Sequence, residues 1–301
     1  NASDLQNDLF AMKLSYEGLF NGNISGISWE HAIGDLSQDV RRDYSFTYDL
    51  MNRLTGAAYA VSNGTPGENF SVPSLTYDLN GNIQNLLRNG NRGDGSFGAL
   101  DNLSYTYQGN RLTNLTDNSG FTQALEDIDH FVTRSNGSPY SYDASGNITV
   151  DPHKGLTFAY NHLNKPVSAI DPSDTNRNIS WIYSADGTKL QETYSGDSSA
   201  THDYVGGFFY KSNTLLHIAH EEGRALKIGE YFRYEFNLTD HLGNIRVSLS
   251  DVDYDGAIEA VEGEVLQVDQ YYPWNKSRQS FDWYRKDLSR TRVYSGGYTQ
   301  I

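Results

Sequence analysis

The chain has 301 residues, a formal net charge of −15 at pH 7 and no cysteine. Its acidity argues against partners such as nucleic acid, because these need a basic surface. The lack of cysteine excludes disulfides and thiol chemistry. No apolar run approaches the ~20 residues that a membrane-spanning helix needs, so we expect no membrane insertion.

The composition favours strands and turns. The chain contains 22 Tyr and 28 Gly but only 2 Met. Tyrosine and threonine suit pleated, half-buried surfaces, whereas glycine, asparagine and aspartate supply turns. We therefore predict an all-β chain with many short hairpins. No signal peptide is visible and Asn1 falls in mid-pattern, so we expect a fragment of a longer protein.

A short unit recurs along the chain. Clear copies occupy residues 45–54, 75–83 and 140–148, and looser copies occupy 14–17, 105–112, 156–161 and 181–187. Each unit has alternating aromatic residues, then Tyr, Asp, two residues, Gly, then Asn or Arg, and Ile or Leu. The aspartate can bond its own backbone two residues on, and the glycine accepts a positive φ.

Each unit is therefore predicted to be one hairpin with a type I turn closed by a left-handed residue. Where glycine is missing, Asn52 and Asn164 take its place, because asparagine also tolerates positive φ. The copy at 105–112 is one residue shorter, which predicts a tighter turn at Gly109-Asn110. A lone hairpin is barely stable, so the hairpins are expected to stack antiparallel, side by side.

Three stretches break the pattern. Residues 63–73 and 89–98 are rich in Gly, Pro and Asn and are expected to be surface loops, and 208–226 is less regular. Within the second stretch, Arg92-Gly93-Asp94 spells an integrin-type tripeptide that we interpret as a chance match. His217-x-x-His220 has metal-ligand spacing, but structural or surface histidines are the favoured interpretation.

The repeated Y-D-x-x-G-[NR]-[IL] pattern resembles the YD repeat of the Rhs (rearrangement-hotspot) family, also found in teneurins. Residues 240–246 (DHLGNIR), followed by 271–274 (YYPW), resemble the signature of the Rhs-associated core region. The similarity covers residues 14–274. It implies a β-sheet wall of stacked hairpins that spirals into a hollow shell. In relatives this shell encloses a C-terminal toxin or another variable domain.

Two departures from the family matter. Pro273 is followed by Trp274-Asn275, where the family usually has an aromatic residue and glycine. Relatives that cleave themselves carry D-P-x-G downstream of the core. Here Asp151-Pro152 and Asp171-Pro172 lack the glycine and precede the core, so we do not predict self-cleavage.

The resemblance divides the chain into two parts. Residues 1–274 are the predicted YD-repeat shell segment, which ends in the core signature at 239–274. Residues 275–301 form a tail with six basic and two acidic residues. This basic tail either docks on the acidic shell or begins a separate C-terminal region.

The sharpest chemical motif lies inside the core signature. Residues 251–262 match the calcium-loop pattern D-x-[DN]-x-[DN]-G-x5-E. The predicted ligands are the side chains of Asp251, Asp253 and Asp255, the carbonyl of Ala257, Glu259 through water, and bidentate Glu262. Gly256 permits the sharp turn, and Ile258 occupies the usual apolar anchor position.

The local charge supports the same interpretation. Residues 251–264 contain six acids and no base, and crowding them without a cation costs Coulomb energy. We therefore predict one Ca²⁺, with a solvated acidic hairpin tip as the alternative. The flanks at 245–249 and 265–268 read as strands, so the ion would stiffen a hairpin tip.

No catalytic motif is evident, and Glu221-Glu222 would face opposite sides of a strand. We predict a non-enzymatic β-shell segment of a secreted or surface-exposed bacterial protein, which encapsulates or presents a C-terminal effector. Other parts of the same polypeptide, or an accessory secretion protein, are expected to cover its open sheet edges. The alternative is a cell-surface adhesin or glycan-binding module that uses its tyrosines and tryptophans.

Overall fold

The computed structural model describes most of the chain. The described residues are 9–31, 40–62, 64, 67–122, 130–132, 138–196, 200–258 and 263–274, together with the backbone of 277–282. Almost all regular structure in them is β-strand, which confirms the predicted all-β class. Within this part of the chain, no helix is long and apolar enough to cross a membrane.

The strands form three antiparallel sheets, and in every sheet they lie side by side in chain order. The first sheet contains β1 (Phe10–Ser15), β2 (Gly26–His31), β3 (Arg41–Tyr48) and β4 (Leu54–Ser62). The second contains β5 (Ser74–Tyr77), β6 (Ile83–Asn91), β7 (Phe97–Gln108) and β8 (Arg111–Asp117).

The third sheet has fourteen strands. They are β9 (Ser141–Tyr142), β10 (Ile148–Asp151), β11 (Leu156–Tyr160), β12 (Pro166–Ile170), β13 (Ile179–Tyr183), β14 (Lys189–Tyr194), β15 (Ala200–Val205), β16 (Phe208–Lys211), β17 (Thr214–His220), β18 (Gly223–Ile228), β19 (Tyr231–Thr239), β20 (Ile245–Leu249), β21 (Val265–Tyr271) and β22 (Ser277–Asp282). A 3₁₀ turn (Thr175–Arg177) links β12 to β13. Residues 208–226, expected to be irregular, thus form parts of three ordinary strands.

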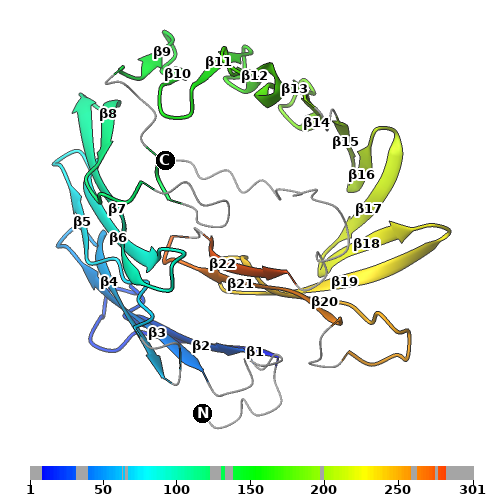
Figure 1. Cartoon of the computed structure of the whole chain (residues 1–301), viewed down its shortest axis with the longest axis horizontal. Coiled ribbons are helices and arrows are strands. Elements are labelled where there is room, and N and C mark those ends of the chain that lie inside the picture. The colour runs from blue at the N-terminus through cyan, green and yellow to red at the C-terminus, as the bar shows by residue number, and fades with distance from the viewer. Residues whose placement is uncertain are drawn as a thin grey trace.

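Short backbone contacts join the three sheets into one wall. Ala57 and Val72 exchange hydrogen bonds of 2.9 and 2.8 Å between the first sheet and the segment before β5. Tyr140 donates to the Thr113 carbonyl at 3.2 Å between the second and third sheets. The wall curves through a wide arc, from β1 past β8 and β13 to β20 (Figure 1). This confirms the predicted wall of flank-to-flank hairpins.

The repeat turns have the predicted geometry. In the turn after β5, the Gly81 N–H donates to the Asp78 carbonyl at 3.2 Å, and Gly81 has φ 89°. The Asp78 carboxylate accepts the backbone N–H of Asn82 at 2.8 Å and also its side-chain amide at 2.8 Å. Where glycine is absent, Asn52 and Asn164 adopt φ 63° and 56°. The motif is therefore a self-capped turn, with the carboxylate holding the start of the return strand.

Six tyrosines each connect a strand to the hairpin before it. Their hydroxyls donate to backbone carbonyls at 2.7–2.9 Å: Tyr48 to Ile24, Tyr77 to Leu54, Tyr107 to Ile83, Tyr142 to Leu112, Tyr160 to Ile148 and Tyr271 to Ile245. Four of these acceptors are the Ile or Leu that opens the preceding unit's return strand, and Leu112 is the second residue of β8. We call these contacts tyrosine rungs. They explain why the tyrosine recurs, although a backbone acceptor does not itself select the aliphatic side chain.

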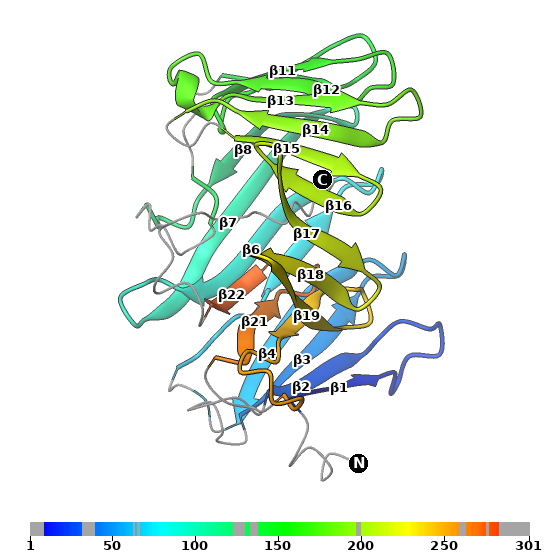
Figure 2. The same ribbon diagram turned by 90° about the vertical axis from the view of Figure 1, so that its right-hand side faces the viewer.

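The repeat turns also share one rim of the wall. Each lies between an odd-numbered strand and the next even-numbered one, so antiparallel pairing places the turns of a sheet at the same end. In Figure 2 they project along the right-hand edge. The opposite rim carries the longer connections, such as the one between β12 and β13.

Candidate functional site: the closing seam and the acidic loop

The end of the described chain packs against its beginning, forming what we call the closing seam. Arg246, from the last repeat unit, is only 4% exposed. Its guanidinium carbon lies 5.2 Å from the ring centre of Trp29, 5.4 Å from that of Phe10 and 5.5 Å from that of Tyr271. In a dry site, each cation–π contact of this kind contributes up to about 2 kcal/mol. The arginine of the DHLGNIR motif thus joins the last sheet to the first.

Tyr272 makes a second contact across the seam. Its ring is buried in the core cluster formed with Trp29, Tyr44 and Phe70. Its hydroxyl donates to the Asn89 carbonyl at 2.6 Å. Tyr272, which directly follows β21, therefore packs against the first two sheets, and β21 lies on the side that the arc encloses (Figure 1).

A glycine makes room for this tyrosine. A Cβ atom on Gly90 would lie 2.7 Å from the Tyr272 hydroxyl and 2.4 Å from Leu100 Cδ1. Gly90 pairs with Gly98 inside the β6–β7 hairpin. The prediction of a surface loop over 89–98 is therefore wrong at its two ends, because these glycines allow close packing within strands. Only the tip between β6 and β7 is a loop.

A buried ion pair supports the same contact. Arg88 and Asp101 are 1% and 2% exposed and are joined by a hydrogen bond of 2.7 Å from Nε. The Arg88 guanidinium carbon lies 4.7 Å from the ring centre of Tyr272. Asp101 also accepts the backbone N–H of Phe131 at 2.7 Å. Breaking a buried pair leaves an uncompensated charge, so this pair strongly specifies the packing around Tyr272.

The acidic loop follows β20, close to the seam (Figure 1). The Asp251 carboxylate accepts the backbone N–H of Tyr254 at 2.6 Å and that of Gly256 at 3.0 Å. Both of these residues have positive φ, 63° and 88°. Glu264, which is 5% exposed, accepts the N–H of Val252 at 3.0 Å. Carboxylates therefore organise the turn from both flanks.

Three carboxylates converge in this loop. Oxygen atoms of Asp251, Asp253 and Glu264 all lie within 4.8 Å of one another. Asp255 is outside this group, and its carboxylate accepts the N–H of Ala257 at 2.8 Å. Three crowded carboxylates are the hard oxygen ligands that calcium prefers.

The predicted ligand set is thus only partly assembled. Asp251 and Asp253 belong to it, whereas Glu259 and Glu262 lie outside the described residues. Glu264 was not among the predicted ligands, although it belongs to the run of six acids that signalled the site. Ile258 packs against the buried valines of β20 and β21, as expected for the apolar anchor.

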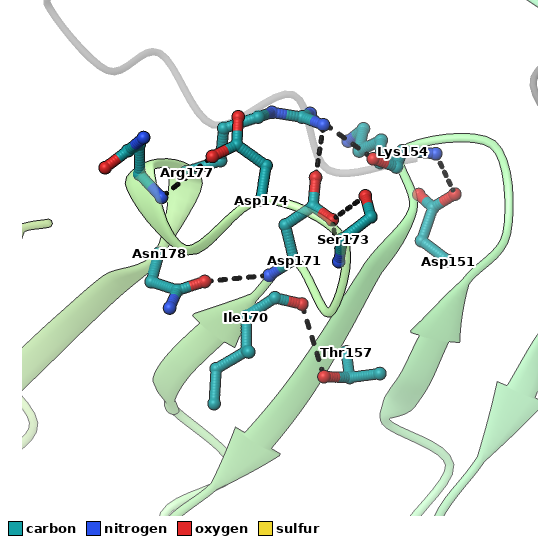
Figure 3. Close-up of polar contacts among 10 residues, drawn as sticks. Asp151, Lys154, Thr157, Ile170, Asp171, Ser173, Asp174, Arg177 and Asn178 are labelled. Atoms are coloured by element: carbon teal, nitrogen blue, oxygen red, sulfur yellow. Dashed lines mark hydrogen bonds and ion pairs between the residues drawn. The ribbon is translucent and has the colours of Figure 1, made fainter. Parts of the chain in front are cut away.

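The two Asp-Pro turns lie on the opposite rim and cap backbone groups (Figure 3). Asp171 is 1% exposed, and its carboxylate accepts from Ser173 and forms an ion pair with Arg177. Hydrogen bonds from Ser173 and the charge of Arg177 lower the pKa of Asp171. Arg177 also donates to the Lys154 carbonyl at 3.4 Å, which links the two turns, and Asp151 accepts the Lys154 N–H at 2.9 Å.

Two other motifs have structural roles. The Arg92 guanidinium donates to the Ala99 carbonyl at 3.1 Å within its own hairpin, so the Arg-Gly-Asp side chains are not jointly displayed. His217 stacks on Phe209 with ring centres 4.7 Å apart. Its neighbour in the motif, His220, packs beside Tyr234 on the next hairpin.

Tyrosine-rung hairpins, capped Asp turns and a seam that joins the last strands to the first sheet define the class of this fold. It is a YD-repeat β-shell wall. No protein-family model matches the chain, and no curated protein matches it in sequence.

Solved structures supply the comparison. The chain is similar to the crystal structure of TcdB2-TccC3-TEV, with a TM-score of 0.56 and 15% identity over 91% of this chain. It is also similar to the Tc holotoxin pore of Photorhabdus luminescens with a TccC3 mutation, with a TM-score of 0.54 and 15% identity over 91%. The chain spans 15% of the length of each matched chain. These neighbours are Rhs/YD-shell proteins, so the family resemblance read from the sequence is confirmed at the level of fold.

Proposed function

We propose that the chain is a non-enzymatic wall segment of a secreted or surface-exposed bacterial Rhs/YD-repeat protein, which encapsulates or presents a C-terminal effector. The observation that carries this proposal is the closing seam. Arg246 and Tyr272 bring the end of a long hairpin series back onto its first sheet. A wall that returns on itself suits enclosure. The Tc toxin neighbours make a toxin-like effector the favoured cargo.

The partners follow from the open edges. Among the described strands, β1 pairs only with β2, and β22 pairs only with β21. Unpaired edges invite association with other chains. We propose that other parts of the same polypeptide, or an accessory protein, cover these edges. The strand β22 belongs to the predicted basic tail, whose residues from 283 onward lie outside the described part.

We further propose that one calcium ion stiffens the acidic loop. Asp251, Asp253 and Glu264 would hold it, and the ion would relieve their mutual repulsion. At the ~10⁻⁴ M affinity of extracellular modules, millimolar calcium would stabilise the fold by about 1.5 kcal/mol. Its role would be structural.

Calorimetric titration tests the calcium proposal. We expect about one Ca²⁺ site, lost in the Asp253→Ala variant. Asp186→Ala, in a repeat turn of β13–β14, is the matched control and should leave the heat unchanged. Absence of heat at millimolar calcium would show that the acidic loop does not bind calcium.

Imaging of the full-length protein tests the shell. Single-particle electron microscopy should show a hollow wall with density inside it, and the effector should resist protease until the wall is denatured. An effector that is cleaved while the wall remains intact would refute enclosure. An Arg246→Met variant, which loosens the seam, should accelerate effector cleavage. Ile182→Ser, on an exposed strand position, is the control.

A further inference from the structure

The first three repeat turns carry large apolar side chains at their tips. Phe20, Leu50 and Leu79 have relative exposures of 104%, 102% and 106%, and Met51 is 73% exposed. We call these four residues the rim ridge. No turn requires them, because the tip positions of a type I turn accept most residues. The later turn at 143–147 carries only Ala144 and Ser145 there.

Hydrogen bonds between turns hold the three tips in one row. The Asn21 side-chain amide donates to Asn52 Oδ1 at 2.6 Å, which joins the first two turns. Arg53 donates to the Asp78 carbonyl at 3.2 Å, which joins the second turn to the third. The apolar tips are therefore neighbours on the rim seen at the right of Figure 2. Single exposed apolar residues are ordinary, whereas several of them gathered along one edge mark an interaction site.

The same three turns are acidic. They contain three acidic residues, Glu17, Asp49 and Asp78, and one basic residue, Arg53. The side-chain hydrogen bond from Arg53 lowers the pKa of Asp49, and that from Asn82 lowers the pKa of Asp78. Both carboxylates thus stay ionised at neutral pH. The surface of a protein that binds here must therefore match apolar side chains surrounded by negative charges.

We propose that the rim ridge is a docking surface for a protein whose contact face combines apolar and basic side chains. Charge complementarity selects this partner. A second copy of the chain would bring like charges together, since the net charge is −15. An anionic lipid surface would be repelled for the same reason. This inference goes beyond the shell proposal, because it assigns a partner to one rim of the wall.

Methionine oxidation reports directly on the ridge. The chain has two methionines: Met51 in the ridge, and Met12, which packs against the core beneath the seam. Dilute peroxide oxidises exposed methionine selectively. We expect fast oxidation of Met51 in the chain described here. In the full-length protein within its natural assembly, oxidation should be about tenfold slower. Molar sodium chloride should weaken this protection, because it screens the charges. Met12 serves as the folding control in each sample.

Variants make the test specific. Leu50→Ser with Leu79→Ser removes two exposed side chains, so the fold should persist while Met51 loses its protection in the assembly. Ile170→Ser, at a 43% exposed position on the opposite rim, should leave the protection intact. Equal Met51 oxidation in the chain and in the assembly would overturn the proposal. So would protection by phosphatidylcholine vesicles alone, which would identify a lipid surface instead.

Discussion

Removing one tyrosine rung should weaken the wall by a measurable amount. Tyr107 in β7 donates its hydroxyl to the Ile83 carbonyl at 2.8 Å. Tyr107→Phe deletes this bond and keeps the ring. A typical intramolecular hydrogen bond contributes about 0.5–1.5 kcal/mol net, so we expect the free energy of unfolding to fall by about 1 kcal/mol.

Tyr105 provides a matched control in the same strand. Its ring lies 6.5 Å from that of Tyr107 on the same face, but its hydroxyl has no hydrogen-bond partner among the described residues. Tyr105→Phe should therefore leave the free energy of unfolding unchanged or raise it. Urea unfolding followed by tryptophan fluorescence measures both values.

The losses in the free energy of unfolding should add when several tyrosine rungs are removed together. Tyr48 and Tyr160 form rungs in the first and third sheets and share no partner with Tyr107, and distant sites are usually additive. The triple variant with Tyr107→Phe should lose about 3 kcal/mol. Equal effects of Tyr105→Phe and Tyr107→Phe would show that the hydrogen bond of the rung adds no stability, because only Tyr107 makes that bond.

Three further outcomes are expected. Burial raises the pKa of the Tyr107 hydroxyl, so the stability it confers is complete below pH ~10 and is lost as pH rises; Tyr107→Phe should move alkaline unfolding, followed by circular dichroism, to higher pH. Burial lowers the pKa of His153, whose ring nitrogens have no hydrogen-bond partner among the described residues. The stability that the neutral His153 side chain contributes to the fold is therefore complete above pH ~6.5 and falls with acidification. His153→Phe should flatten the loss of stability from pH 7 to 5, whereas the exposed His162→Phe should not; equal slopes would contradict this. Gly90→Ala should cost about 1–3 kcal/mol in urea unfolding by crowding Tyr272, and a neutral result would place that tyrosine elsewhere.

The hairpins could be predicted because their signals are local. The Asp-x-x-Gly spacing specifies a turn through bonds within five residues, and Asn52 also adopts a positive φ at a position without glycine. The rungs could not be predicted in this way. Each acceptor carbonyl belongs to the preceding hairpin, as with Tyr77 and Leu54, and a backbone carbonyl leaves no residue-type signature.

The seam and the acidic site were predictable only in part. Nothing local to Gly90 reveals that Tyr272 will lie against it, so a Gly-rich stretch reads as a loop. The loop motif identified Asp251 and Asp253, but the structure adds Glu264, which lies two residues beyond the motif. Motif spacing describes a helix-flanked loop, whereas here a strand follows, and Glu264, just before that strand, approaches the turn from the other side.

A double-mutant cycle between Arg246 and Trp29 tests whether the wall closes onto its first sheet. These residues are distant in sequence, and their contact exists only if the wall returns onto its first sheet. We expect Arg246→Met and Trp29→Leu to be coupled by about 1–2 kcal/mol in urea unfolding. Additivity within about 0.3 kcal/mol would contradict the closing seam.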